Sequence, residues 1–208
     1  MVLRLSAIHL YPVKGIGGVS PTRAEVNPQG LAHDRRWLIV DSQGQFVSQR
    51  TQPRLAVISG SFDGRRLTLA APGRDSLDLE VPGGNDRLDV TVWRDSLSAA
   101  AVGHRADNWI SEYLDQECRL AYMDRKAIRP ISSSAGQSGE TVSFADGYPC
   151  LLSSNASLSD LNSRLATPVP MNRFRPNLVV DGCGAFAEDS WRLIGIGGAV
   201  FRFAGLCP

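Results

Sequence analysis

The sequence has few lysines. Of its 208 residues 22 are basic, but only Lys14 and Lys126 are lysines, so arginine carries nearly all the positive charge. The 21 acidic residues leave a net charge of +1, which argues against a nucleic-acid-binding surface. The arginine excess has two interpretations. It reflects nucleotide composition in the genome, or it provides planar forks for phosphate and carboxylate groups.

Long hydrophobic runs are missing as well. The longest run, Leu193 to Phe201, is interrupted by Gly and Ala, whereas a bilayer-spanning helix needs about 20 apolar residues. The apolar segment after Arg4 is broken too early for the core of a signal peptide. We therefore expect a cytoplasmic protein with no membrane partner.

Cysteine is sparse and scattered. Cys118, Cys150, Cys183 and Cys207 show neither zinc-finger nor C-x-x-C spacing. This pattern predicts reduced thiols in a cytosolic protein, with two disulfides as the alternative.

What the first hundred residues do contain is a series of short strand signals separated by Gly, Pro, Asp and Ser. Such a series is typical of an antiparallel sandwich or barrel. The expected strands are residues 2–10, 22–26, 36–41, 45–49, 55–59, 66–70, 77–81, 88–93 and 97–102. Turns are expected at residues 41–44 and 62–64, where Gly supplies a positive φ.

Helical periodicity occurs twice, at residues 106–114 and 157–165, the second with Asn155 or Ser157 as N-cap. Strands are expected again at residues 177–180 and 199–203, with a turn at 195–198. A segment rich in Ser and Gly, residues 128–139, is the expected linker or mobile loop. The sequence thus predicts a mainly β (α+β) fold that divides near residue 125.

The segment Arg173-Phe174-Arg175-Pro176-Asn177 is the sharpest local feature. Pro176 disfavours the right-handed helical region for Arg175, so we expect an extended segment. Arg173 and Arg175 would then share one face about 7 Å apart, with Phe174 pointing into the core. Two guanidinium groups at that spacing can bind a phosphate; the alternative is an edge strand with two solvated arginines.

Two further segments are candidate sites. Residues 11–18 combine Lys14 with three glycines, which suits either an anion-binding nest or an ordinary hairpin connection. In residues 33–37, Asp34 and Arg35 form either an ion pair that holds Arg35 for a ligand or a weak surface pair.

Together these motifs form an ordered series. They are Tyr11-Pro12-Val13-Lys14, Gly30-Leu31 with Asp34-Arg35-Arg36-Trp37, Gln49-Arg50 with Pro53-Arg54-Leu55, Phe144-Ala145-Asp146-Gly147-Tyr148-Pro149, Ser157-Leu158 with Asp160-Leu161-Asn162, Arg173-Phe174-Arg175-Pro176-Asn177 and Ala187-Glu188-Asp189-Ser190-Trp191. The series resembles MOSC proteins that carry an N-terminal β-barrel domain, a family that includes the mitochondrial amidoxime-reducing component and its bacterial relatives. The resemblance implies a MOSC N-terminal β-barrel domain over residues 1–125. It also implies an incomplete MOSC β-barrel with one or two helices over residues 126–208.

The resemblance further implies a molybdenum cofactor, a pyranopterin with a terminal phosphate. The residues implied at the cofactor are Lys14, Gly15, Arg35, the Gly147 backbone, Arg173, Arg175 and Asn177. Relatives often have Ser where Gly15 stands. They also continue through a C-x-R-C motif that supplies the molybdenum thiolate, whereas this sequence stops at Pro208, one residue after Cys207. We expect a C-terminally truncated chain whose metal-ligand cysteine lies beyond residue 208, with Cys207 as the alternative ligand.

The resemblance implies that the intact protein is an oxidoreductase that reduces N-hydroxylated or N-oxide compounds. The alternative is a carrier of molybdenum cofactor or sulfur without turnover, and a third outcome is a fragment that binds nothing. Since the chain has no ferredoxin cysteine spacing, electrons are expected from a separate donor protein or a lost ferredoxin domain.

Overall fold

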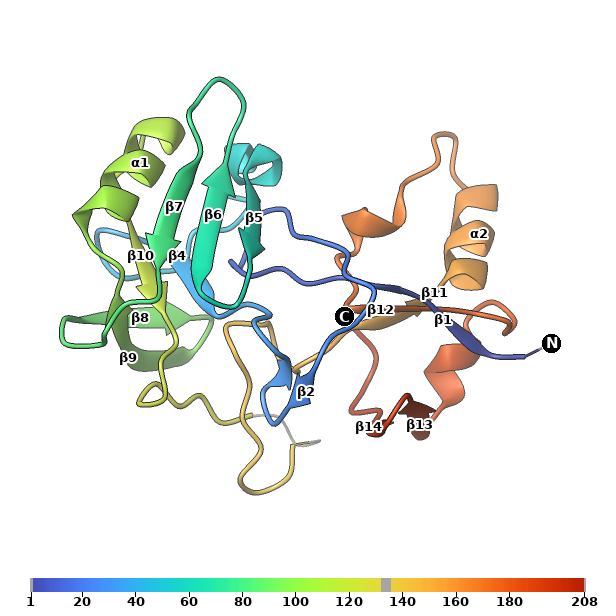
Figure 1. The fold of residues 1–208 in the computed structure, drawn as a ribbon. Coiled ribbons are helices and arrows are strands. Elements are labelled where there is room, and N and C mark those ends of the chain that lie inside the picture. The colour runs from blue at the N-terminus through green and yellow to red at the C-terminus, as the bar shows by residue number, and fades with distance from the viewer. Residues whose placement is uncertain (1, 132–135, 208) are drawn as a thin grey trace.

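The chain folds into two lobes (Figure 1). The computed structural model describes residues 2–131 and 136–207. One lobe contains a four-stranded antiparallel sheet of order β4-β10-β9-β8 and a three-stranded antiparallel sheet of order β5-β6-β7. Its elements are β4 (Trp37–Asp41), β5 (Ser59–Phe62), β6 (Arg66–Ala70), β7 (Leu77–Glu80), β8 (Arg87–Val92), β9 (Asp95–Ala101), α1 (His104–Leu114) and β10 (Cys118–Tyr122).

The second lobe is built on a three-stranded sheet of order β1-β12-β11. Its elements are β1 (Arg4–Ile8), β11 (Leu152–Ser154), α2 (Asn155–Ser163), β12 (Leu178–Asp181), β13 (Leu193–Ile196) and β14 (Ala199–Arg202). β1 is antiparallel to β12 and β11 is parallel to it. The first strand of the chain therefore lies in the same sheet as β11 and β12, which are about 150 residues or more further along the sequence. A short pair, β2 (Val26–Asn27) and β3 (Gly30–Leu31), follows β1 in sequence.

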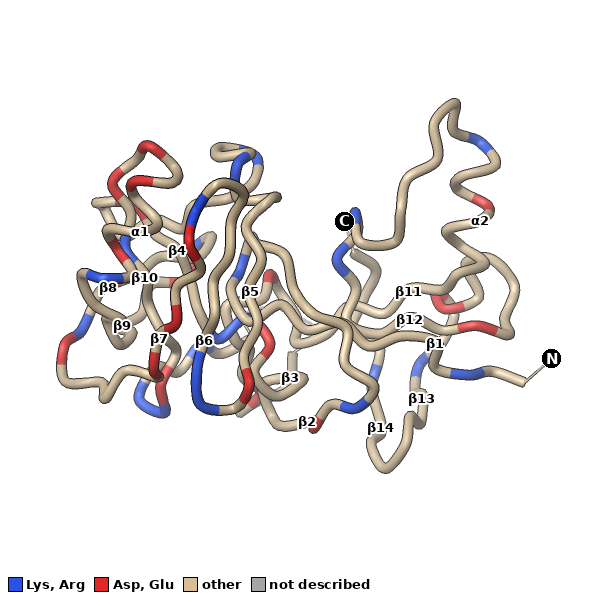
Figure 2. Tube along the Cα trace, turned by 45° about the horizontal axis from the view of Figure 1, so that its top comes forward, with Lys and Arg blue, Asp and Glu red and all other residues tan. Residues whose placement is uncertain are grey.

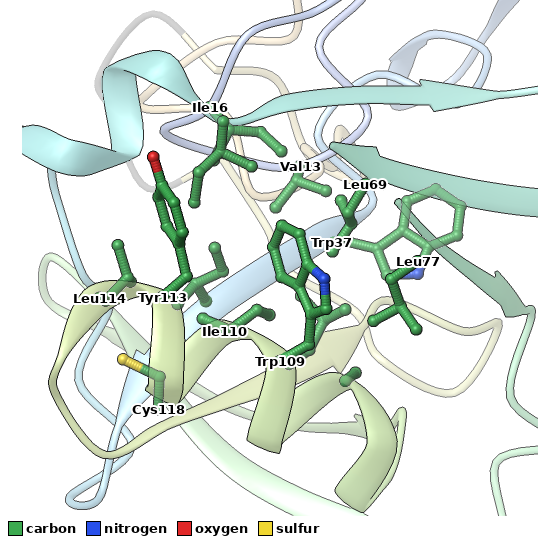
Figure 3. Close-up of a cluster of buried hydrophobic side chains, with 14 of the residues drawn as sticks. Val13, Ile16, Trp37, Leu69, Leu77, Trp109, Ile110, Tyr113, Leu114 and Cys118 are labelled. Atoms are coloured by element: carbon green, nitrogen blue, oxygen red, sulfur yellow. The ribbon is translucent and has the colours of Figure 1, made fainter. Parts of the chain in front are cut away.

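The first lobe has apolar side chains packed on both faces of β4. Trp37 and Ile39 face a core with α1, and the alternate residues Leu38 and Val40 face a second core. Figure 3 shows the first core, where Trp37 lies beside Trp109 of α1. Because both faces of β4 are buried, its sequence from Trp37 to Val40 is uninterruptedly apolar.

A segment from beyond residue 125 completes the second core of this lobe. Phe144 is fully buried there, and its amide donates to the carbonyl of Arg35 at 2.9 Å. Gly30 makes a similar link: it has φ +112°, and a Cβ there would lie 2.8 Å from the carbonyl oxygen of Pro149. Only glycine combines that backbone with so close a contact. These contacts fix residues 144–149 against the first lobe.

The mainly β (α+β) prediction is confirmed, with two α-helices and five sheets among the described residues, none of them closed into a barrel. The turns at residues 41–44 and 195–198 are also confirmed, with positive φ at Gly44 and Gly197. Of the segment at residues 128–139, residues 132–135 lie outside the described part. None of the described helices is both long and apolar enough to cross a bilayer.

Several local predictions are wrong. The strand expected at 55–59 is a 3-10 helix over Pro53–Val57, because Pro53 at its first position lacks an N–H and favours helix initiation. Residues 22–26 form a strand only from Val26, and residues 45–49 make only isolated bridges. The N-cap of α2 is Ser154, whose hydroxyl accepts from the Ser157 amide at 3.0 Å.

Candidate functional site

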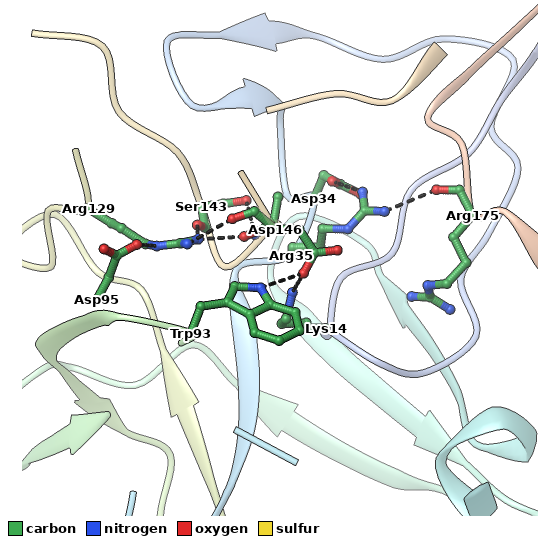
Figure 4. Close-up of polar contacts among 10 residues, drawn as sticks. Lys14, Asp34, Arg35, Trp93, Asp95, Arg129, Ser143, Asp146 and Arg175 are labelled. Atoms are coloured by element: carbon green, nitrogen blue, oxygen red, sulfur yellow. Dashed lines mark hydrogen bonds and ion pairs between the residues drawn. The ribbon is translucent and has the colours of Figure 1, made fainter. Parts of the chain in front are cut away.

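Polar side chains from distant segments gather where the two lobes meet (Figure 4). Lys14 follows β1, Asp34 and Arg35 precede β4, Asp146 lies in the segment docked on the first lobe, and Asn177 lies directly before β12. We call Lys14, Asp34, Arg35, Asp146, Arg175 and Asn177 the cationic cluster. Both charge signs are interspersed along the rest of the chain (Figure 2).

Arg35 lies at the centre of the cluster. It forms an ion pair with Asp34, and its Nη1 donates to Oδ1 of Asn177 at 2.9 Å. Its Nη2 donates to the backbone carbonyl of Arg175 at 3.1 Å. Asp34 is buried and accepts from the Tyr11 amide at 2.8 Å. The Asp34–Arg35 pair is thus a buried pair that joins the two lobes, not a surface pair.

Arg175 has the least satisfied charge in the cluster. Its guanidinium carbon lies 4.2 Å from the centroid of the Tyr11 ring, which Arg35 also approaches at 4.7 Å. Burial and the nearby charge of Arg35 lower the pKa of Arg175 to about 10. Its Nη2 atom is buried and has no hydrogen-bond partner among the described residues.

The backbone at Arg175 corrects one prediction. Arg173 ends a short 3-10 helix (Met171–Arg173), and Arg175 has φ +55°. Pro176 disfavours the right-handed helical region for Arg175 but leaves both the extended and the left-handed regions open. The segment adopts the left-handed one, so Arg173 and Phe174 are exposed and Phe174 does not point into the core.

Lys14 is buried at the other end of the cluster. Its Nζ donates to Oδ1 of Asp146 at 2.6 Å, and the indole of Trp93 donates to the same oxygen at 2.9 Å. Burial lowers the pKa of Lys14, with the charge of Asp146 partly opposing the shift. Desolvation would raise the pKa of Asp146, but its side chain is 75% exposed, and Lys14, Trp93 and Arg35 together lower the pKa.

Arg129 holds the Asp146 segment in place. It is 4% exposed, and its guanidinium donates to three backbone carbonyls, those of Ser143, Ala145 and Asp146. Its Nε donates to Asp95 at 2.8 Å. Neither Arg129 nor Trp93 was singled out from the sequence. A basic residue among apolar neighbours was the only available signal for Arg129, and Trp93 had none.

The structure brings together four of the expected site residues: Lys14, Arg35, Arg175 and Asn177. Gly15 adjoins Lys14 and its carbonyl accepts from Gln49 at 2.7 Å; Gly147 follows Asp146 and is exposed. Arg173 lies exposed beside the cluster. Cys207 is exposed and lines a separate cavity that none of the cluster residues lines. Within residues 2–131 and 136–207, no three His, Cys, Asp or Glu side chains gather as a metal site.

The fold and the cluster together define a mainly β protein with a partly buried cationic site between two lobes. Two family models match the chain: the MOSC N-terminal beta barrel domain over residues 2–117 and the MOSC domain over residues 139–208. The chain belongs to the family of MOSC proteins that carry this N-terminal domain.

Curated relatives include mitochondrial amidoxime-reducing component 1 of Mus musculus, which is 35% identical over 98% of this chain and 63% of its own length. Component 2 of Bos taurus is 33% identical over 98% of this chain and 64% of its own length. The chain thus spans less than two thirds of these relatives. A Bordetella bronchiseptica protein solved in solution gives a TM-score of 0.38 at 26% identity, over 50% of this chain and 90% of that one.

Proposed function

We propose that the cationic cluster holds a molybdenum cofactor and that the intact protein reduces N-hydroxylated or N-oxide compounds. The observation that carries the proposal is the half-buried Arg175 guanidinium beside Arg35, whose buried Nη2 has no hydrogen-bond partner among the described residues. Two like charges placed together in a desolvated site are unfavourable unless an anion joins them. The terminal phosphate of the cofactor is such an anion.

The residues present fit this group. Arg175 has the free donor for the phosphate, whereas Arg35 uses its donors on Asp34, Asn177 and the Arg175 carbonyl. Arg35 therefore adds positive charge and fixes the position of Arg175. The exposed backbone at Gly147, with Lys14 and Asp146 beside it, offers polar contacts to the pterin. Gly15 adds a backbone amide, and the exposed Arg173 adds charge at the rim.

When bound, the cofactor would supply the redox centre that accepts oxygen from the substrate. The chain's own residues bind and orient that group. The relatives' names as amidoxime-reducing components support this substrate class. Electrons would come from a separate donor protein or from a ferredoxin domain. The metal thiolate would come from a cysteine beyond residue 208 or from Cys207. The cytoplasmic location stays a prediction.

The test is to express the chain in a host that makes the cofactor. Molybdenum and pterin per chain are measured first, followed by reduction of an N-hydroxylated compound with a chemical electron donor. Pterin binding with reductase activity, in this chain or in one extended through the C-x-R-C motif, supports the proposal. Pterin with no turnover in either chain favours the carrier function. No pterin in either chain contradicts the proposal.

A further inference from the structure

A second candidate site is lined by residues of the β1-β12-β11 lobe together with Gly30 and Pro149, and by none of the residues of the cationic cluster. It is a cavity of about 650 Å³, within the size range of small-molecule sites. Most of its lining is apolar and includes Leu158, Leu161, Met171, Phe186, Val200 and Phe201. Phe186 and Val200 are 46% and 74% exposed, so an apolar occupant would remove hydrophobic surface from water.

One polar group in the lining is incompletely satisfied. Glu188 belongs to the 3-10 helix Ala187–Ser190 and is buried, with only 7% of its surface exposed. Its Oε1 accepts from the Ser154 amide at 3.0 Å and from the Ser157 hydroxyl at 2.6 Å. Its Oε2 is buried and has no hydrogen-bond partner among the described residues.

The neighbouring serines cannot satisfy Oε2 as well. The Ser157 hydroxyl donates to Oε1 and accepts from the Phe186 amide at 2.8 Å. The Ser154 hydroxyl accepts from the Ser157 amide at 3.0 Å and lies 2.7 Å from the Ser157 hydroxyl. This network fixes the carboxylate at the N-terminus of α2 and leaves Oε2 as a positioned acceptor.

The charges around the cavity are mainly acidic. Its lining includes Glu140, Asp189 and Arg202 besides Glu188. Arg202 is paired with Glu140 at 2.9 Å. The lining therefore favours a ligand that carries positive charge over an anion.

We propose that this cavity binds a small molecule with an apolar body and one cationic, N–H-donating head group, which donates to Oε2 of Glu188. The apolar body covers the exposed side chains, and the head group completes the hydrogen bonding of a buried carboxylate. A neutral apolar molecule leaves Oε2 unpaired, and an anionic one meets like charge. None of the residues of the cationic cluster lines this cavity, although Cys207 does. The isolated chain without cofactor is enough to test the proposal.

The probes are 3-phenylpropylammonium, neutral 3-phenylpropanol and anionic 4-phenylbutyrate, which share one apolar body. Binding is followed by NMR of ¹³C-methyl-labelled methionine, because the chain has only three methionines, Met1, Met123 and Met171. Met171 lines the cavity, whereas Met123 is fully buried in the core of the other lobe and is the reference signal. The ammonium should shift the Met171 signal with a Kd at least roughly tenfold lower than that of the alcohol. Equal binding of all three probes, or none, overturns the proposal.

The matched variants are Glu188→Gln and Glu112→Gln. The first removes the charge while keeping an oxygen that can accept from Ser154 and Ser157. The second makes the same change on α1, where Glu112 is exposed and paired with Arg74. Glu188→Gln should weaken ammonium binding roughly tenfold and leave alcohol binding unchanged, with Glu112→Gln binding like the original protein. Equal ammonium binding by both variants overturns the proposal. If Glu188→Gln fails to fold, as an altered Met123 signal would report, the three-probe series on the unchanged protein still decides.

Discussion

Arg35 donates a hydrogen bond to the backbone carbonyl of Arg175 at 3.1 Å, across 140 residues of sequence. The bond joins the segment before β4 to the segment before β12. It also fixes the backbone of Arg175, which has φ +55°, a region that costs a non-glycine residue about 1–2 kcal/mol. Two guanidinium groups are thereby brought to the same tyrosine ring. Strain and like-charge proximity at one position are typical of a site organised for a ligand.

Removing the charge of Arg175 should leave the ligand-free protein at least as stable as before. In Arg175→Gln a desolvated cation beside Arg35 is lost, while the carbonyl that accepts from Arg35 is retained. We expect an unchanged or higher unfolding temperature by calorimetry, measured without cofactor. A fall of more than about 4 °C, roughly 1 kcal/mol or more for a chain of this size, would show that Arg175 is a structural residue.

Removing the charge of Asp34 should destabilise the protein, in contrast to removing the charge of Arg175. Asp34→Asn leaves the Arg35 guanidinium without its anionic partner in a buried site, where Arg35 is 11% and Asp34 2% exposed at the side chain. Breaking a buried pair by removing one partner costs about 3–5 kcal/mol, measured here by denaturant unfolding. The control is Asp160→Asn, which breaks the more exposed pair with Arg164 and should cost under about 1 kcal/mol. Similar losses in the two variants would contradict the account.

The two lysines make the charge state of Lys14 directly measurable. In Asp146→Asn the attraction that partly opposes the burial of Lys14 is gone, so the pKa of Lys14 should fall further. NMR of ¹³C-labelled lysine side chains would show two signals, and Lys126 provides the reference. An unchanged or higher pKa for Lys14 in this variant would mean that Asp146 is not its partner in solution.

The lowered pKa of Lys14 also predicts how the stability of the protein depends on pH. The folded pKa of Lys14 is below its unfolded value, so between the two values the unfolded chain binds more protons. The contribution of Lys14 to the free energy of unfolding therefore rises as pH increases through the folded pKa. Lys14→Met should remove that rise when denaturant unfolding is compared across alkaline pH. A steeper rise in Lys14→Met would show that the sign is wrong.

Replacement by alanine should destabilise the protein more at Gly30 than at Gly64, which also has a positive φ. Gly30→Ala and Gly64→Ala both place a side chain at positive φ, +112° and +99°, but only at Gly30 does the Cβ meet a neighbour, Pro149. Gly30→Ala should cost about 1–3 kcal/mol more in denaturant unfolding, the usual range for overpacking. Equal costs would mean that Pro149 moves away without loss.

The sequence indicated the elements with strong local signals and missed those set by tertiary contacts. Residues 66–70 alternate apolar and polar side chains and form β6 with the expected bounds. β10 was missed because Cys118–Tyr122 contains no β-branched residue; the strand forms because β4 and β9 pair with it on both sides. The 3-10 helix at Pro53 and the left-handed backbone of Arg175 are conformations that the local sequence allows but does not require.

The candidate site was predictable as a set of residue types, not as an arrangement. The resemblance drew attention to Lys14, Arg35, Arg175 and Asn177, and these meet in the structure. The partners that hold these residues in place come from segments with no periodic signal. Asp146 accepts a hydrogen bond from Lys14, and Arg129 donates one to the backbone carbonyl of Asp146. Such pairings depend on how the two lobes dock, which the local sequence does not encode.

The most direct test of the central claim is the pterin content of Arg175→Ala compared with Arg164→Ala, both purified from a host that makes the cofactor. Arg164 is an exposed arginine at the end of α2, outside the cluster. We predict that Arg175→Ala retains less than about one tenth of the pterin, as expected when a charge-assisted phosphate contact is lost, while Arg164→Ala retains the normal amount. Equal pterin in the two proteins would show that the cationic cluster does not hold the cofactor.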